Sequence, residues 1–143
     1  EYEQFFKEMQ AKYPGRFVLC QGFVPELARK IYGGSDIFLM PSKSEPCGLS
    51  QMVALRYGSI PVVRETGGLK DSITDSGDGK GNGFTFQTYD TQDMLNSVHR
   101  AIYAYNESKD GWKVLVERAM ACDNSWGRSA NDYIRLYKQL INS

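Results

Sequence analysis

The 143-residue sequence has only three cysteines, one histidine and no excess of either charge. Cys20, Cys47 and Cys122 are an odd number without close spacing, which argues against a disulfide framework or a zinc site and favours reduced intracellular thiols. Lys plus Arg and Asp plus Glu each number 17, so no broad basic face for nucleic acid is expected. Any anion must therefore be bound by local groups.

Long hydrophobic runs are also missing. No apolar stretch approaches the roughly 20 residues that a membrane-spanning helix needs, and the start EYEQFFKEMQ lacks the basic-then-apolar layout of a signal peptide. We expect a soluble protein with no membrane partner. The length suits one domain, and because residue 1 is not Met and a helical pattern is already running, we expect a piece of a longer protein.

The hydrophobic pattern alternates between strands and helices. Three short apolar runs are typical of buried strands, namely RFVLCQ (16–21), DIFLMPS (36–42) and SIPVVRE (59–65). PELARKIYGG and GLSQMVALRYG between them are helix-like and end in glycine, and further helices are expected at the start, from about residue 90, near 110–121 and over 127–142. Residues 72–84 suggest a loop. This order predicts an α/β domain with a parallel sheet flanked by helices.

In an open parallel sheet, ligands bind beyond the carboxyl ends of the strands, and the loop PSKSEPCGLS is the most informative of those there. Gly48 to Ser50 would open a helix whose free N–H groups suit a phosphate, while Glu45 could accept hydrogen bonds from sugar hydroxyls. One loop would then hold both parts of a nucleotide sugar. The alternative is that Ser50 or Ser44 only caps the helix, Glu45 is solvated and Gly48 forms a turn.

Other candidate groups stay open between a binding role and a structural one. Gly67 and Gly68 in ETGGL allow a ligand to approach or make a tight turn, and the motif is not a GxGxxG fingerprint. Arg64 and Lys43 could reach a cleft or lie exposed on loops. The remaining titratable groups favour structural roles: His99 as a solvated or packed helical residue, Asp36 at a strand entry, and Asp75 and Asp78 as loop formers rather than metal ligands.

The stretch GGSDIFLMPSKSEPCGLSQMVALRYGSIPVVRETGGLKDSI resembles the glycogen synthase and bacterial-type starch synthase family, continuously from about Gly22 to Ile73. Ser125-Trp126 and the later YIRLY are similar to the family's C-terminal end. The resemblance implies a retaining glucosyltransferase that extends an α-1,4-glucan from ADP-glucose. It also implies a GT-B architecture of two Rossmann-like domains, in which residues 1–143 are a C-terminal nucleotide-sugar-binding domain without its first strands and without the N-terminal domain.

Carried over residue by residue, the resemblance assigns Glu45 to the transferred glucose as the catalytic-site carboxylate. It assigns Cys47, Gly48, Leu49 and Ser50 to the sugar and diphosphate, and Phe23 to a place beside the adenine, where a core phenylalanine is the alternative. It also makes Thr66, Gly67 and Gly68 a loop that borders the glucosyl site.

The sequence departs from related enzymes in two ways. Val53 stands where many retaining glycosyltransferases carry a second Glu, and the family's diphosphate-binding Arg and Lys would lie before residue 1. The resemblance favours a front-face reaction in which the leaving phosphate takes the proton of the acceptor hydroxyl. We expect no cofactor and no essential metal, a requirement for the missing N-terminal domain, and no transfer by residues 1–143 alone.

Alternatives remain. EPCGLSQ, in place of a GFGLxxxEA type loop, favours ADP-glucose over a UDP-glucose-dependent GT-B enzyme, and a non-catalytic nucleotide- or glucan-binding module is the third possibility. We expect the bacterial cytoplasm, or the plastid for a plant starch synthase. The two Trp residues are expected to be packing anchors, and Tyr133 and Tyr137 are candidate contacts between domains.

Overall fold

The computed structural model describes residues 2–142 and contains one sheet of three parallel strands. The strands are β1 (Ile37–Met40), β2 (Ile60–Arg64) and β3 (Phe84–Phe86), in the order β1-β2-β3. In the register of the first pair Ile37 lies beside Ile60, and in that of the second Val62 lies beside Phe84. The expected parallel α/β arrangement is confirmed.

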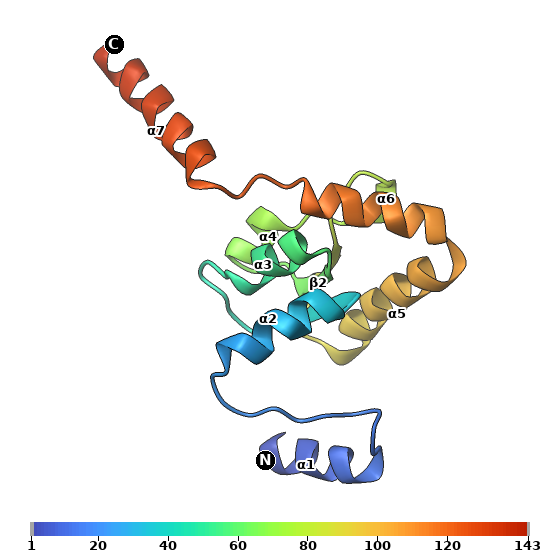
Figure 1. Cartoon of the computed structure of the whole chain (residues 1–143). Helices are drawn as coiled ribbons and strands as arrows, with labels where there is room; N and C mark the ends of the chain where they lie inside the picture. Colours follow the sequence, from blue (N-terminus) through green and yellow to red (C-terminus); the bar gives the residue numbers. More distant parts are fainter. Residues whose placement is uncertain (1, 143) are drawn as a thin grey trace.

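Seven α-helices and one 3-10 turn surround or extend from this sheet within residues 2–142 (Figure 1). Helices α3, α4, α5 and α6 pack against β2, and α2 packs against α3. No helix of this described part is long and apolar enough to cross a membrane. The bounds are α1 Tyr2–Lys12, α2 Pro25–Gly34, α3 Ser50–Tyr57, α4 Gly68–Ser72, η1 Ser76–Asp78, α5 Thr91–Glu107, α6 Lys109–Met120 and α7 Trp126–Ile141.

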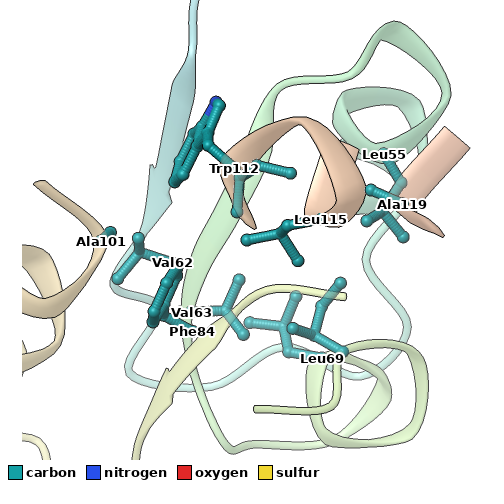
Figure 2. Packing of buried hydrophobic residues seen from close by; sticks show 11 residues of the cluster. Leu55, Val62, Val63, Leu69, Phe84, Ala101, Trp112, Leu115 and Ala119 are labelled. Carbon is teal, nitrogen blue, oxygen red and sulfur yellow. The ribbon is translucent and has the colours of Figure 1, made fainter. Parts of the chain in front are cut away.

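The core forms where α6 closes over the sheet and α3. Figure 2 shows Trp112, Leu115 and Ala119 of α6 directed toward side chains of β2, β3, α3 and α4. The first four residues of β2, 60–63, are all buried, so this strand is enclosed on both faces, as its continuous apolar run predicts. Trp112 is the packing anchor that was expected, with its ring edge-on to Tyr105 at 5.2 Å between centroids.

The prediction of a strand over RFVLCQ is wrong for this structure. Residues 17–21 are extended but pair with no strand, and they run between α1 and α2 away from the sheet (Figure 1). Their contacts are local: the Leu19 N–H donates to Gln10 Oε1 at 2.6 Å, and the Phe17 ring stacks on Phe6. An apolar run becomes a strand only when another strand satisfies its N–H and C=O groups, and no described strand lies beside this one.

Two elements went unrecognised in the sequence. Residues 84–86 form β3, although the glycine- and aspartate-rich stretch before them suggested only a loop. With three residues, β3 is too short for a periodicity to be read. The short α4 likewise follows directly from the Gly67 turn.

The two terminal helices contribute nothing to the core, because neither α1 nor α7 has a buried residue. Helix α7 projects from the body of the molecule (Figure 1). Trp126 at its start is 89% exposed, so the expectation that it is a packing anchor is wrong for the described chain. The rings of Tyr133 and Tyr137 lie 6.2 Å apart and tilted to each other on the same exposed helix.

Asp75 organises the loop that leads into β3. Its carboxylate accepts hydrogen bonds from the N–H groups of Gly77 and Thr85 and pairs with the guanidinium of Arg100. Partial burial acts to raise the pKa of Asp75, but the Arg100 hydrogen bond and charge, together with the two N–H groups, outweigh it and leave the pKa below 3.8. Asp75 is therefore a loop former, as expected.

Replacing Asp75 with Asn should cost about 1 kcal/mol of stability at pH 7, because the charged hydrogen bonds are partly exposed and only moderately strong. A carboxylate whose pKa is depressed on folding stabilises above its unfolded value and loses this effect as the pH falls through the folded value. The difference in unfolding free energy between wild type and Asp75→Asn should therefore shrink below about pH 4. Urea titrations at pH 7 and pH 3 measure it, with the exposed Asp71→Asn as control; an equal difference at both pH values contradicts the assignment.

Candidate functional site

The candidate site lies where β1 and β2 end, at the carboxyl edge of the sheet. Residues 41–49 form the loop after β1, and residues 65–67 form the turn after β2. Arg64, the last residue of β2, donates from its guanidinium to the carbonyl oxygens of Lys43 (2.8 Å) and Ser42 (3.4 Å). These bonds tie the loop to the neighbouring strand, so Arg64 has the structural role.

The loop and the turn touch through backbone atoms. A Cβ built on Gly67 would lie 1.9 Å from the carbonyl oxygen of Glu45, and one on Gly68 would lie 1.9 Å from that of Cys47. The Gly68 N–H donates to the Pro46 carbonyl at 3.2 Å. No side chain fits at either glycine, and the two lie in a tight turn between β2 and α4, the structural alternative given above.

The first turn of α3 is open. Gly48 is buried with a φ of +72°, a left-handed conformation that glycine adopts without strain, and it leads the chain into the helix. The N-cap residue is Leu49, and no side chain makes a capping hydrogen bond there. The alternative in which Ser50 or Ser44 caps the helix is therefore not what the structure shows. The first N–H groups of α3 thus have no side-chain cap, and an uncapped helix start suits an anion.

The side chains around this turn differ in exposure. Glu45 is half-buried, and no described residue gives its carboxylate a hydrogen bond or ion pair. The Cys47 thiol is free and exposed, and the Leu49 side chain is 71% exposed. Ser50 is half-buried at the first position of α3. This loop therefore carries an unpartnered carboxylate a few residues before the uncapped start of α3.

Thr66 and Phe23, the two remaining predicted site residues, belong to different segments of the chain. Thr66 belongs to the turn after β2, and its N–H donates to the Arg64 carbonyl at 2.9 Å. Phe23 precedes α2 and is 93% exposed. The structure thus brings the 41–49 loop and the turn after β2 together, while the ring of Phe23 is unpacked.

Tyr89 was missed in the sequence. Its ring lies 5.7 Å from the guanidinium carbon of Arg64 and 6.0 Å from the Lys43 ammonium. Both cations therefore lie within cation–π range of one aromatic ring, Lys43 at its outer limit. Gln51 was also missed, although an amide in the apolar stretch LSQMVALRY was a usable signal for a buried polar group.

Residues away from the two loops show structural contacts. Asp78 accepts from the Lys80 N–H, and Asp36 stands directly before β1, in the roles expected of both. Within residues 2–142 no three His, Cys, Asp or Glu side chains gather as metal ligands would. Exposed His99 lines a cavity of about 570 Å3 between η1, α5 and α6. That cavity lies at the amino end of β3, opposite the candidate site.

Comparison with known proteins gives one consistent result. Residues 1–111 match the family described as glycosyl transferases group 1. The chain is 52% identical over 143 residues to a glycogen synthase of Bacillus cereus and 48% identical over 143 residues to one of Pseudothermotoga lettingae. Both alignments include 99% of this chain but only 30% and 29% of those proteins, so the chain spans less than a third of their length.

Solved structures agree with this result. The catalytic domain of starch synthase IV from Arabidopsis thaliana, bound to ADP and acarbose, matches with a TM-score of 0.84 and 41% identity over 98% of this chain and 30% of that one. A sucrose-phosphate synthase from Thermosynechococcus elongatus, 21% identical with a TM-score of 0.65 over 99% of this chain and 35% of that one, shares the fold. The resemblance to glycogen and starch synthases is confirmed, and this chain belongs to the group 1 glycosyl transferases.

Proposed function

We propose that this chain is the donor-binding part of a glycogen or starch synthase, which transfers glucose from ADP-glucose to the 4-hydroxyl of an α-1,4-glucan with retention. One observation carries the proposal: Glu45, without a partner, is held on the same short turn as the uncapped first turn of α3. A carboxylate and a row of amide donors a few residues apart match a sugar joined to a diphosphate. Residues 1–143 would be the C-terminal domain of a two-domain GT-B enzyme.

The relatives support the substrate class. Proteins called glycogen synthase are about half identical over the whole chain, and the starch synthase neighbour was solved with ADP and acarbose bound. The inferred partners are therefore ADP-glucose, the α-1,4-glucan and the N-terminal domain. Bacterial relatives favour the cytoplasm.

Each residue of the turn has a chemical role in this proposal. The Glu45 carboxylate accepts hydrogen bonds from glucose hydroxyls and stabilises positive charge that develops on the sugar ring. Backbone N–H groups from Cys47 to Ser50, with the Ser50 hydroxyl, hold the diphosphate. Gly67 and Gly68 border the glucose through the turn that supports Glu45.

Retention follows from the side of attack. A double displacement would need a carboxylate nucleophile beneath the anomeric carbon. Glu45 instead positions the sugar and stabilises its charge, so the new bond forms on the face from which the diphosphate leaves. The departing phosphate oxygen takes the proton of the acceptor hydroxyl, and the α3 N–H groups stabilise its charge. Phe23 is assigned to the adenine, where its exposed ring could stack.

Glu45→Gln in the complete enzyme should lower kcat for glucose transfer at least about 100-fold while changing the Kd for ADP less than about threefold, because the amide keeps the shape but not the charge near the sugar. Steady-state kinetics and calorimetric ADP titration measure the two quantities. Glu3→Gln, the same change on exposed α1, is the matched control. Equal losses in both quantities would place Glu45 at the nucleotide instead.

Gly68→Ala should weaken binding of ADP-glucose, because its Cβ would collide with the Cys47 carbonyl and push the loop out of place. Gly34→Ala is the control, since nothing lies within 4 Å of a Cβ at Gly34. We expect the Kd of the complete enzyme for ADP-glucose to rise more than about tenfold for Gly68→Ala only, with circular dichroism checking that both variants fold. Unchanged binding by folded Gly68→Ala would show that the loop contact is not needed.

Residues 1–143 alone should bind ADP weakly and transfer no glucose, because one wall of a cleft neither holds the acceptor nor excludes water. Incorporation of radiolabelled glucose into glycogen, with the complete enzyme as the positive control, tests this. Incorporation by the isolated chain would overturn the expected need for the other domain. A larger thermal shift with UDP than with ADP would favour the alternative UDP-glucose enzyme.

A further inference from the structure

Gln51 is a fully buried amide in the first turn of α3, with 0% of its surface exposed. Its Nε2 atom lies 3.0 Å from the Gly48 carbonyl oxygen, 3.4 Å from that of Cys47 and 3.0 Å from the Ser72 hydroxyl. The amide hydrogens thus point back into the turn that carries the open helix end. A side chain of α3 holds the backbone immediately before α3.

Ser72 extends this contact to the second turn. Its hydroxyl accepts from Gln51 and donates to the Gly68 carbonyl at 2.6 Å. A chain of hydrogen bonds therefore runs from the Cys47 and Gly48 carbonyls, through Gln51 and Ser72, to Gly68. It joins the two turns by a second route, in addition to the direct contact of their backbones.

The two N–H groups of the Gln51 side chain, rather than its oxygen, make the contacts that hold the turn. Its Oε1 is buried without a hydrogen-bond partner in the described chain, and a Cβ at Gly48 would lie 2.6 Å from it. An unpartnered buried oxygen is destabilising, so the amide is worse for packing alone than an apolar side chain of the same length. The opposite orientation of the amide would point its oxygen at two carbonyl oxygens. The arrangement is accounted for by the two N–H groups that hold the turn.

We propose that Gln51 is a positioning residue for glucosyl transfer: it fixes the Cys47 and Gly48 peptides, and through Ser72 the Gly68 peptide, in the orientation that the donor needs. This inference rests on the proposed function. The backbone N–H groups of this turn are the proposed diphosphate donors, and their directions are set by the same peptide planes whose carbonyls Gln51 holds. Gln51 itself, being buried, does not touch the substrate.

Two substitutions of Gln51 distinguish the effect of its N–H hydrogen-bond donors from the effect of its side-chain volume. Gln51→Met keeps the length and removes both N–H groups, and it should lower kcat/KM for ADP-glucose in the complete enzyme about 10- to 100-fold, because small misplacements of binding groups are costly. The KM for the glucan should change less than about twofold, since the acceptor contacts are elsewhere. Gln51→Glu also keeps the volume, but its carboxylate faces carbonyl oxygens and can donate only when protonated.

The Gln51→Glu variant adds a pH readout. Burial raises the pKa of a carboxyl group, so the acid form should be populated within the working range of the enzyme. Its kcat/KM relative to wild type should rise several-fold from pH 8 to pH 6, or stay far above that of Gln51→Met if the acid form already dominates. Either result would mean that the protonated carboxyl group replaces the amide as hydrogen-bond donor to the turn. A Glu variant as poor as Met at every pH contradicts the proposal.

Serine variants supply the matched control. Ser72→Ala and Ser97→Ala each remove a hydroxyl that donates to a backbone carbonyl at 2.6 Å, but Ser97 is buried between α5 and β3, away from the turns. Ser72→Ala should lower kcat/KM about three- to tenfold and show coupling to Gln51→Met, whereas Ser97→Ala should alter only thermal stability. Similar kcat/KM losses for the two serine variants would contradict the positioning role, because the effect would then not be specific to the turns.

Amide hydrogen exchange without ligand separates this inference from the proposed function. Gln51→Met should speed exchange of the hydrogen-bonded amides of Thr66, Gly68 and Leu69 by at least about tenfold, and Ser97→Ala should not. If wild-type enzyme transfers no glucose from ADP-glucose, the proposed function fails and so does a positioning role in that reaction. If it does transfer glucose while Gln51→Met exchanges and reacts like wild type, only the Gln51 inference fails.

Discussion

The close approach of two backbone turns determines the rest of this site. The carbonyl oxygens of Glu45 and Cys47 occupy space that any Cβ at Gly67 or Gly68 would fill, and one N–H to carbonyl bond joins Gly68 to Pro46. Backbone contact at this distance leaves little freedom to either turn. The Glu45 side chain and the first amides of α3 therefore start from fixed positions, which matters because binding groups must be placed before the substrate arrives to contribute fully.

The sheet explains why these turns meet. β1 and β2 are parallel neighbours, so their carboxyl ends lie at the same edge, and β2 is buried on both faces by helices that keep it in place (Figure 2). Arg64 at the end of β2 then binds the loop that leaves β1, while Tyr89 packs against its guanidinium. The packing that fixes β2 in the core therefore also fixes the loop bound to the end of this strand. A loss of packing around β2 would displace both turns together.

The sequence was informative where local patterns determine structure and silent where distant partners do. The apolar run at 59–65 and the glycine-ended helix before it predicted β2 and α3, because burial and capping act locally. RFVLCQ has the same apolar character but no strand beside it, and β3 is too short to recognise. Gly67 and Gly68 were consistent with either a ligand or a tight turn, and only the fold shows that the Glu45 and Cys47 backbone lies against them. Gln51 needed the fold as well, since its acceptors include Ser72, 21 residues away.

The charged side chains near the site indicate which part of donor binding this turn can provide. Arg64 is engaged by carbonyl oxygens of the loop, whereas the exposed Lys43 lies 6.0 Å from the Tyr89 ring and has no ion-pair partner among residues 2–142. The end of α3 offers about half a positive charge, whereas a diphosphate carries more than one full negative charge. Amides can orient the phosphates but cannot balance them. In the proposed enzyme, this turn therefore sets the position of the donor, and the full charges that stabilise its departure must come from other groups.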